Sequence, residues 1–240
     1  MHYSWNWSVL TVEPNFGWIL SGIEWTILVS LAAWCIAFTL GSALGIARTV
    51  RSPIVRALAG GYVELFRNIP LLVQMFLWYF VLPEVLPERW GTWLKRDLPN
   101  AEFWTAVVCL GLYTACRVCE TVRSGIGSIS RGQSYAGLAT GLTPFQVYFY
   151  ILLPVGYRII MPALTTEFLS IFKNSSLALT IGVLELTGQT RRISEYTFQP
   201  IEMFLTATAL YGLITLTVTA LMRVVEGRSR LPGMITVAVQ

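Results

Sequence analysis

The sequence predicts an all-α integral membrane protein with about five transmembrane helices, and three observations support this fold class. Only 12% of the 240 residues are charged and 55% are hydrophobic, whereas soluble domains average about 25% charged residues. The mean hydropathy is +0.61. Residues 25–47 and 203–222 contain no charged side chain, and a membrane-spanning helix needs about 20 mainly apolar residues. A chain of this composition has to face lipid over much of its surface.

Five spans follow from the apolar runs in chain order. The first span precedes every Lys and Arg, because the first basic residue is Arg48. A signal peptide would need a basic n-region, so we expect this segment to remain in the membrane. Three further segments carry Gly, Pro and ionisable residues, which membrane helices tolerate. The expected spans are 25–47, 58–82, 103–121, 158–184 and 203–222, and residues 82–100 are expected to form an external loop with a short surface helix.

The distribution of Lys and Arg between the loops predicts the orientation. With the N-terminus outside, nine basic residues lie in inner loops and five in outer loops, which agrees with the excess of positive charge on the cytoplasmic side of membrane proteins. We therefore expect an external segment at 1–18, a transmembrane domain at 19–225 and a cytoplasmic tail at 226–240.

Several functional classes find little support in the sequence. The net charge of +4 comes from basic residues scattered singly, not from a patch that would bind nucleic acid. Cys116 and Cys119 form a C-x-x-C motif, but without a βαβ context we expect two small apolar residues on one helix. The chain has neither an H-E-x-x-H nor a G-x-S-x-G motif, so we expect no catalytic or metal site. A self-sufficient secondary transporter is disfavoured because the spans show no internal repeat.

Ionisable residues within the expected spans are candidates for function, because they are costly in lipid and usually face a bundle interior or a watery path. Arg117 and Glu120 are spaced i, i+3 and can meet on one helix face. A permanent structural bridge and a substrate contact are both compatible with that spacing. Glu64 and Arg67 have the same spacing, and there we favour a structural ion pair.

The sequence K-N-S-S at 173–176 interrupts the fourth span at its middle. A broken helix at this place would expose backbone groups to a cavity, which is a common design of substrate sites in transporters. The alternative is a buried Lys173 that pairs with Glu167 or Glu120.

Residues 132–154 are predicted to form two short helices on the cytoplasmic face. The first should end at Gly141, since glycine is the usual residue after a helix. The second should begin near Thr143, a good N-cap, with Pro144 at its first position. The alternative is an ordinary amphipathic loop.

This stretch resembles the cytoplasmic EAA loop of binding-protein-dependent ABC importers, whose pattern is E-A-A-x(3)-G-x(9)-I-x-L-P. Tyr135, Ala136 and Gly137 fall on the E-A-A positions, Gly141 on the glycine and Ile151 on the isoleucine. Segments 64–74, 162–177 and 181–187 resemble the polar amino-acid branch of these importers, the histidine/glutamine/glutamate permeases. The similarity covers most of residues 20–223 and implies a type I ABC importer permease fold with a cytoplasmic coupling helix.

The resemblance implies that 132–154 is a coupling loop that docks on a separate ABC ATPase dimer. The chain has no G-x(4)-G-K-[ST] loop, so we expect ATP to be bound by that partner and no cofactor in this chain. Tyr135 replaces the acidic residue of the family pattern and Gly137 replaces an alanine, so shape and apolar packing would have to carry the docking. The residues expected to couple to the ATPase are Tyr135, Ala136, Gly137, Leu138, Gly141 and Leu142.

The resemblance also implies a second permease subunit, homologous or identical, and a periplasmic amino-acid-binding protein. It places the chain in the inner membrane of a bacterium, with residues 1–18 in the periplasm. Gly41 and Gly45 form a small-xxx-small stripe that lets helices approach closely. We expect this stripe to join the two permease halves, although packing within one subunit would use the same pattern.

The expected substrate is a polar amino acid, with glutamate or aspartate favoured over glutamine, histidine or arginine. Arg117 occupies a position that is usually neutral and aromatic in the resembled family. Arginine binds carboxylates in a bidentate fork, and Lys173 would add a second positive charge for a second carboxylate. Glu120 is expected to hold Arg117 while the site is empty. The residues expected to contact the substrate are Arg117, Lys173, Glu120, Thr114, Asn174 and Ser175.

Overall fold

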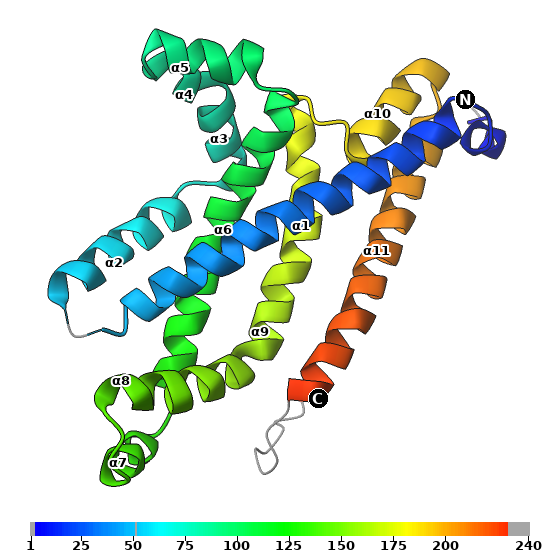
Figure 1. Cartoon of the computed structure of the whole chain (residues 1–240). Coiled ribbons are helices and arrows are strands. Elements are labelled where there is room, and N and C mark those ends of the chain that lie inside the picture. Colours follow the sequence, from blue (N-terminus) through cyan, green and yellow to red (C-terminus); the bar gives the residue numbers. More distant parts are fainter. Residues whose placement is uncertain (1–2, 51, 230–240) are drawn as a thin grey trace.

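The structure is a computed structural model that describes residues 3–50 and 52–229, and its regular elements within this part of the chain are all helices (Figure 1). The expected all-helical membrane fold with about five spans is confirmed. Four segments are long and apolar enough to cross a membrane, and a bent pair of helices supplies a fifth crossing if it counts as one span. The four segments are Asn15–Ala47, Ala101–Gly127, Pro144–Ile181 and Pro200–Arg228, and the bent pair is Pro53–Asn68 with Leu71–Val85.

Helix α1 (Asn15–Ala47) crosses α6 (Ala101–Gly127) and α9 (Leu153–Asn174) obliquely and packs on both (Figure 1). Its 33 residues span about 50 Å at 1.5 Å per residue, which exceeds the ~30 Å hydrocarbon core of a bilayer and favours a tilted helix. The helix begins ten residues before the expected start at 25. The charge of Glu24 ends the apolar run there, but the helix continues because α10 (Leu186–Thr197) packs beside it.

Close packing between α1 and α6 depends on two glycines. A Cβ atom at Gly41 would lie 2.6 Å from Cβ of Val118, and one at Gly45 would lie 2.7 Å from Cβ of Val122. Only residues without a side chain permit this approach of two backbones. The expectation that the stripe joins two permease halves is therefore wrong, because α6 of the same subunit already occupies it.

The expected span at 58–82 contains a break between α2 (Pro53–Asn68) and α3 (Leu71–Phe76), where the chain bends by 100°. Ile69 is extended, as a residue before proline prefers to be, and Pro70 cannot continue a helix that needs its amide hydrogen. The side-chain amide nitrogen Nε2 of Gln74 donates to the backbone carbonyls of Phe66 and Ile69, at 2.8 Å each. These bonds satisfy carbonyls that the break leaves without a helical partner.

The expected external loop contains more regular structure than one short helix. After α3, the π-helix η2 (Leu77–Val81) leads into α4 (Leu82–Val85), α5 (Glu88–Thr92) and the π-helix η3 (Trp93–Asp97). These elements lie at one end of the molecule, near the first residues of α6 (Figure 1).

The opposite end of the molecule carries a helical hairpin. It consists of α7 (Arg131–Ala139), α8 (Pro144–Val147) and the π-helix η4 (Tyr148–Leu152), and η4 continues directly into α9. The helical segment of the fourth span therefore runs from Pro144 to Ile181 and is longer than expected. The sequence K-N-S-S changes α9 into the 3-10 helix η5 (Ser175–Ile181) near the end of this segment, not at its middle.

Helix α11 (Pro200–Ser229) packs against α9 and α10 and leaves most of its side chains exposed. Its last residues lie toward the end that carries the α7–α8 hairpin, whereas the short helix η1 (Trp7–Leu10) and α10 lie at the other end (Figure 1). The helix continues past 226, the expected start of the tail, and residues 230–240 lie outside the described part of the chain.

Candidate functional site

The turn between α7 and α8 is built from the residues that the sequence predicts. Gly141 has a left-handed φ of +87°, a conformation that costs glycine little. The amide of Gly141 donates to the carbonyl of Leu138 at 3.0 Å, and the amide of Leu142 donates to that of Gly137 at 3.2 Å. This pair of bonds is a Schellman motif, which closes a helix at a left-handed residue. The expected end of the first short helix at Gly141 is confirmed.

The second short helix begins at the expected cap. The amide of Gln146 donates to the Thr143 hydroxyl at 3.3 Å, while the Thr143 amide donates to the Gln146 side chain at 2.9 Å. Pro144 follows at the first helical position. This reciprocal capping box satisfies two amide donors that a helix start leaves free, and together with the Schellman motif it fixes the shape of the turn.

The residues of the hairpin are divided between buried and exposed positions. A Cβ atom at Gly137 would lie 2.8 Å from Ile151 and 2.9 Å from Val147, so this glycine lets α7 pack closely on the helix that follows. Gly137 is therefore buried inside the hairpin and offers no surface to a partner, contrary to its expected docking contact. Tyr135, Phe145 and Tyr150 are exposed by 65 to 71%. Ala136, Leu138 and Gly141 are also exposed, whereas Leu142 is half-buried.

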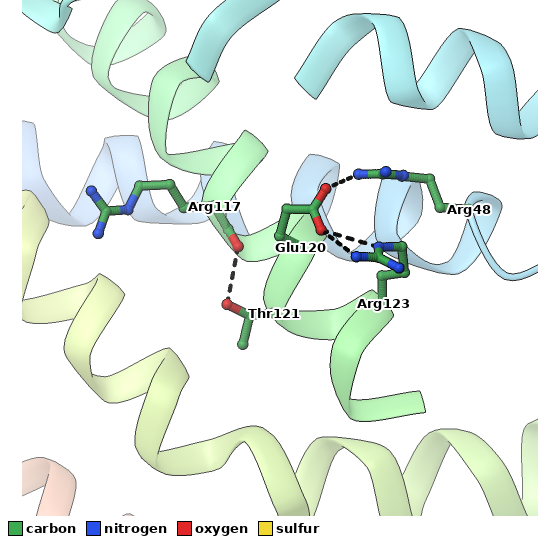
Figure 2. A network of polar contacts seen from close by, with 5 residues as sticks. All are labelled: Arg48, Arg117, Glu120, Thr121 and Arg123. Carbon is green, nitrogen blue, oxygen red and sulfur yellow. Dashed lines mark hydrogen bonds and ion pairs between the residues drawn. The ribbon is translucent and has the colours of Figure 1, made fainter. Parts of the chain in front are cut away.

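Figure 2 shows how the carboxylate of Glu120 is held. It pairs with Arg48 at the end of α1 and with Arg123 one turn further along α6, where the two nitrogen–oxygen distances are 3.0 and 2.8 Å. The side chain of Arg117 points away from this group (Figure 2). The predicted pair between Arg117 and Glu120 is therefore wrong, because two other arginines occupy the carboxylate.

Arg117 makes its ion pair across a helix interface. Its Nε atom lies 2.6 Å from Oε2 of Glu167 on α9. The side chain of Glu167 is 12% exposed, whereas that of Arg117 is 45% exposed. The carboxylate is thus enclosed between α6 and α9, and part of the guanidinium stays open to a second anionic partner. Sequence spacing could not reveal Glu167 as the partner, because the two residues lie on different helices.

Lys173 lies in a different environment from Arg117. Its side chain is exposed and takes part in none of the ion pairs found within residues 3–50 and 52–229, so the predicted alternatives of a pair with Glu167 or Glu120 are wrong. It lines an open pocket of about 430 Å³ between the end of α9 and α11. The pocket also contains the hydroxyl side chains of Ser176, Thr187, Thr208 and Tyr211.

The remaining predicted contacts are less accessible. Thr114 and Ser175 are buried, at 1% and 0% exposure, and the Ser175 hydroxyl donates to the carbonyl of Phe172 at 2.8 Å. Asn174 is half-buried at the end of α9. The structure therefore does not bring the six predicted substrate residues into one pocket.

The expected pair on α2 is absent as well. Among the residues that the structure describes, no ion pair joins Glu64 to Arg67, and both side chains are exposed. Their spacing permits contact, but an exposed pair gains little in water and has to order two long side chains.

Glu185 is a buried polar residue that the sequence analysis did not single out. Its fully buried carboxylate accepts hydrogen bonds from the amides of Thr187 (3.0 Å) and Gly188 (2.9 Å) and from the hydroxyl of Tyr211. Burial raises the pKa of the Glu185 carboxyl above its usual range, although these three hydrogen bonds act in the opposite direction. The residue caps α10 and ties it to α11, directly beside the pocket that contains Lys173.

Comparison with known proteins identifies the family to which this chain is similar. The sequence matches the family model described as "Binding-protein-dependent transport system inner membrane component" over residues 16–231. It is 46% identical over 241 residues to the glutamate/aspartate import permease protein GltJ of Escherichia coli (strain K12), with 97% of this chain and 98% of the relative covered. It is 35% identical over 222 residues to the nopaline transport system permease protein NocM of Agrobacterium fabrum, with 90% and 89% covered.

Two solved structures have the same fold. The crystal structure of an amino acid ABC transporter with histidines contains a chain that superimposes with a TM-score of 0.79 at 25% identity, covering 95% of this chain and 100% of that one. An inward-facing structure of the MetNI methionine ABC transporter gives a TM-score of 0.74 at 18% identity, covering 92% and 100%. The second similarity shows the fold alone.

Proposed function

This chain belongs to the family of binding-protein-dependent transport system inner membrane components, and from this premise we propose that it carries glutamate or aspartate into the cytoplasm. It is a membrane-spanning permease subunit of an ATP-driven amino-acid importer, and it is not an enzyme. A separate ATPase hydrolyses the ATP. The finer assignment to an acidic substrate is supported by the near full-length similarity to a glutamate/aspartate permease and by Arg117.

Arg117 is the observation that carries the proposal. A cation inside a membrane span costs free energy and needs a partner, and Glu167 supplies one at 2.6 Å. The guanidinium has five N–H donors in a fork, and its 45% exposure leaves donors free for a substrate carboxylate. We propose that Glu167, and not Glu120 as the spacing on α6 predicted, holds Arg117 while no substrate is present.

Lys173 supplies a second positive charge at the C-terminal end of α9. Its pocket is open and contains four hydroxyl groups, which suits a carboxylate that arrives from the outside. We propose that Arg117, Lys173 and Asn174 contact the substrate along its path. Glu120, Thr114 and Ser175 are proposed to shape the path from behind, since Glu120 is held by two arginines and the other two are buried.

The α7–α8 hairpin is proposed as the docking element for an ABC ATPase dimer. Its exposed aromatic and apolar residues, among them Tyr135 and Leu138, present a surface that excludes water on docking. Ala136 and Gly141 are exposed as well and Leu142 is half-buried, whereas Gly137 acts indirectly by letting the two short helices pack.

The relatives also suggest the rest of the assembly. We propose a second permease subunit and a periplasmic amino-acid-binding protein as partners, and a multi-pass orientation with the N-terminus in the periplasm and the C-terminus in the cytoplasm. The opposite placement of η1 and the α7–α8 hairpin (Figure 1) supports this orientation, since it puts the hairpin and the end of α11 on one side.

Uptake of radiolabelled amino acids tests the proposal. Cells with and without this subunit are compared for glutamate, aspartate, glutamine, histidine and arginine. We expect glutamate and aspartate uptake to depend on the subunit. Dependence restricted to glutamine, histidine or arginine would replace the acidic substrate by the second candidate, another polar amino acid. Transport by the purified chain alone in liposomes, without an ATPase or a binding protein, would contradict the importer assignment.

A further inference from the structure

The end of α1 touches both the α7–α8 hairpin and α6. Arg48 caps α1 and pairs with Glu120 on α6, and both side chains are largely shielded, with 21% and 28% exposure. The next residue, Thr49, shares a hydrogen bond with the hydroxyl of Tyr148 in η4. We name Arg48 and Thr49 the α1 corner.

The donor in the bond between Thr49 and Tyr148 follows from the single hydrogen that each hydroxyl group carries. The Thr49 hydroxyl donates its one hydrogen to the carbonyl of Ile46 at 2.8 Å, so Tyr148 donates to Thr49. Within residues 3–50 and 52–229, the bond between Tyr148 and Thr49 is the side-chain hydrogen bond that joins the hairpin to the end of α1. The ring of Tyr148 also packs against the apolar cluster that contains Val122, Ile126 and Ile160. The hydroxyl is thus held in place from two sides.

Helices α1 and α6 are expected to move as one unit because they are closely packed. The close contacts at Gly41 and Gly45 leave no space between the two backbones, and tightly packed interfaces shift as units more readily than they deform. Glu120 lies one turn from Arg117 on α6, and Arg117 is paired with Glu167 on α9. A displacement of the α1 corner therefore changes the position of α6 relative to α9 at the Arg117–Glu167 pair.

We infer that the α1 corner is a joint through which movement of the α7–α8 hairpin reaches α6 and Arg117, beside the direct continuation of η4 into α9, which carries Glu167. Tyr148 passes the displacement to Thr49, and Arg48 passes it to Glu120 and α6. Arg48, Thr49 and Tyr148 are then positioning residues that act through Arg117 and touch neither substrate nor ATPase. The inference rests on the proposed function, because it needs the hairpin to be the element that the ATPase moves.

The isosteric substitutions Thr49→Val and Tyr148→Phe remove the bond with little change in volume. Each variant is assembled with its ATPase, its permease partner and its binding protein in proteoliposomes, and glutamate uptake and ATP hydrolysis are measured together. We expect normal membrane levels and normal hydrolysis, with glutamate transported per ATP lowered about five-fold, the factor that one hydrogen bond of ordinary net strength represents. The double variant should lose no more than either single variant, because both remove the same bond.

Thr121→Val is the matched control. The Thr121 hydroxyl bonds to the carbonyl of Arg117 on its own helix at 3.0 Å (Figure 2), so its loss should leave transport per ATP unchanged. Unchanged transport per ATP in Thr49→Val and Tyr148→Phe, or losses that add in the double variant, would overturn the inference. Gly141→Asp in the same assay distinguishes the coupling role of the hairpin from the role of the α1 corner. If Gly141→Asp stops uptake while Thr49→Val and Tyr148→Phe transport normally, the hairpin still couples and only the role of the α1 corner is refuted. If Gly141→Asp transports normally, the coupling role of the hairpin itself is refuted.

Discussion

The guanidinium of Arg117 on α6 lies 2.6 Å from the carboxylate of Glu167 on α9, so this ion pair joins two membrane helices. Glu167 is enclosed and Arg117 is partly open. The arrangement keeps a cation available inside the membrane while its charge is balanced. Two consequences for transport can be measured.

Arg117→Tyr should abolish the fork that binds a carboxylate. Because hydrogen bonds to charged groups contribute about 1.5–3 kcal/mol, we expect kcat/KM for glutamate to fall about ten- to a hundred-fold. The measurement is uptake at several glutamate concentrations, normalised to the amount of subunit in the membrane.

The substitution also leaves Glu167 without its cation, which is costly for an enclosed charge. The double variant Arg117→Tyr with Glu167→Gln removes that cost and serves as the folding control. It should reach the membrane at the normal level and still fail to transport glutamate. Recovery of glutamate uptake in the double variant would show that Arg117 has a structural role alone.

Glu167→Gln alone should have the opposite effect on affinity. It releases Arg117 from competition with an internal carboxylate, so the KM for glutamate should fall, provided the fold is kept. A rise in KM would mean that Glu167 orients Arg117 for the substrate and does not compete with it.

Lys173→Gln removes the positive charge from the pocket beside α11. We expect a several-fold higher KM for glutamate and aspartate and little change for neutral amino acids, since the side chain makes no ion pair within the described residues. The control is Lys95→Gln in η3, at a lysine that pairs with Glu84 in α4. Equal losses in the two variants would indicate a general effect of surface charge on encounter.

Gly141→Asp should stop uptake while the protein still reaches the membrane. Aspartate is among the residues that tolerate a left-handed φ such as the +87° of Gly141, so the expected defect comes from the new charge, which lies without a partner on the proposed docking surface. Gly141→Asn is the matched control, because asparagine tolerates this backbone conformation and carries no charge. It should retain most of the uptake, and complete loss in Gly141→Asn would assign the defect to the backbone.

Gly41→Ala and Gly45→Ala should destabilise the single subunit. The new Cβ atoms would lie 2.6 and 2.7 Å from Val118 and Val122, and overpacking of this kind costs about 1–3 kcal/mol. Thermal unfolding of the purified subunit measures the loss. Gly212→Ala is the control, because a Cβ atom there meets nothing within 4 Å, and a similar loss in this variant would refute the packing argument.

Glu185 should give the stability of the protein a dependence on pH. Its raised pKa means that the folded state holds the proton more tightly than the unfolded state, so this contribution is complete below the ordinary carboxyl pKa and is lost as the pH rises through the raised value. Glu185→Gln does not titrate, and its side chain keeps one acceptor oxygen in place of the two that Thr187, Gly188 and Tyr211 use. Its melting temperature should fall less over that pH interval than that of the wild type, and parallel curves would contradict the assignment.

Local chemistry allowed the sequence to predict the membrane class and the shape of the hairpin. Hydropathy is a sum over about 20 consecutive residues, and it located the spans well enough to count them. The cap at Thr143 and the turn at Gly141 involve residues within five positions of each other, so the chain encodes them without reference to the rest of the fold.

Contacts between distant residues were decided by the tertiary structure alone. Glu120 and Arg48 are 72 residues apart, and their pairing depends on how α1 lies against α6. The spacing on one helix predicted ion pairs between Arg117 and Glu120 and between Glu64 and Arg67. Such spacing shows which residues of one helix can meet, but it does not show whether a residue of a neighbouring helix competes for the same partner. In the same way, the small residues at Gly41 and Gly45 marked a close contact, and only the packed structure identified α6 as the helix that fills it.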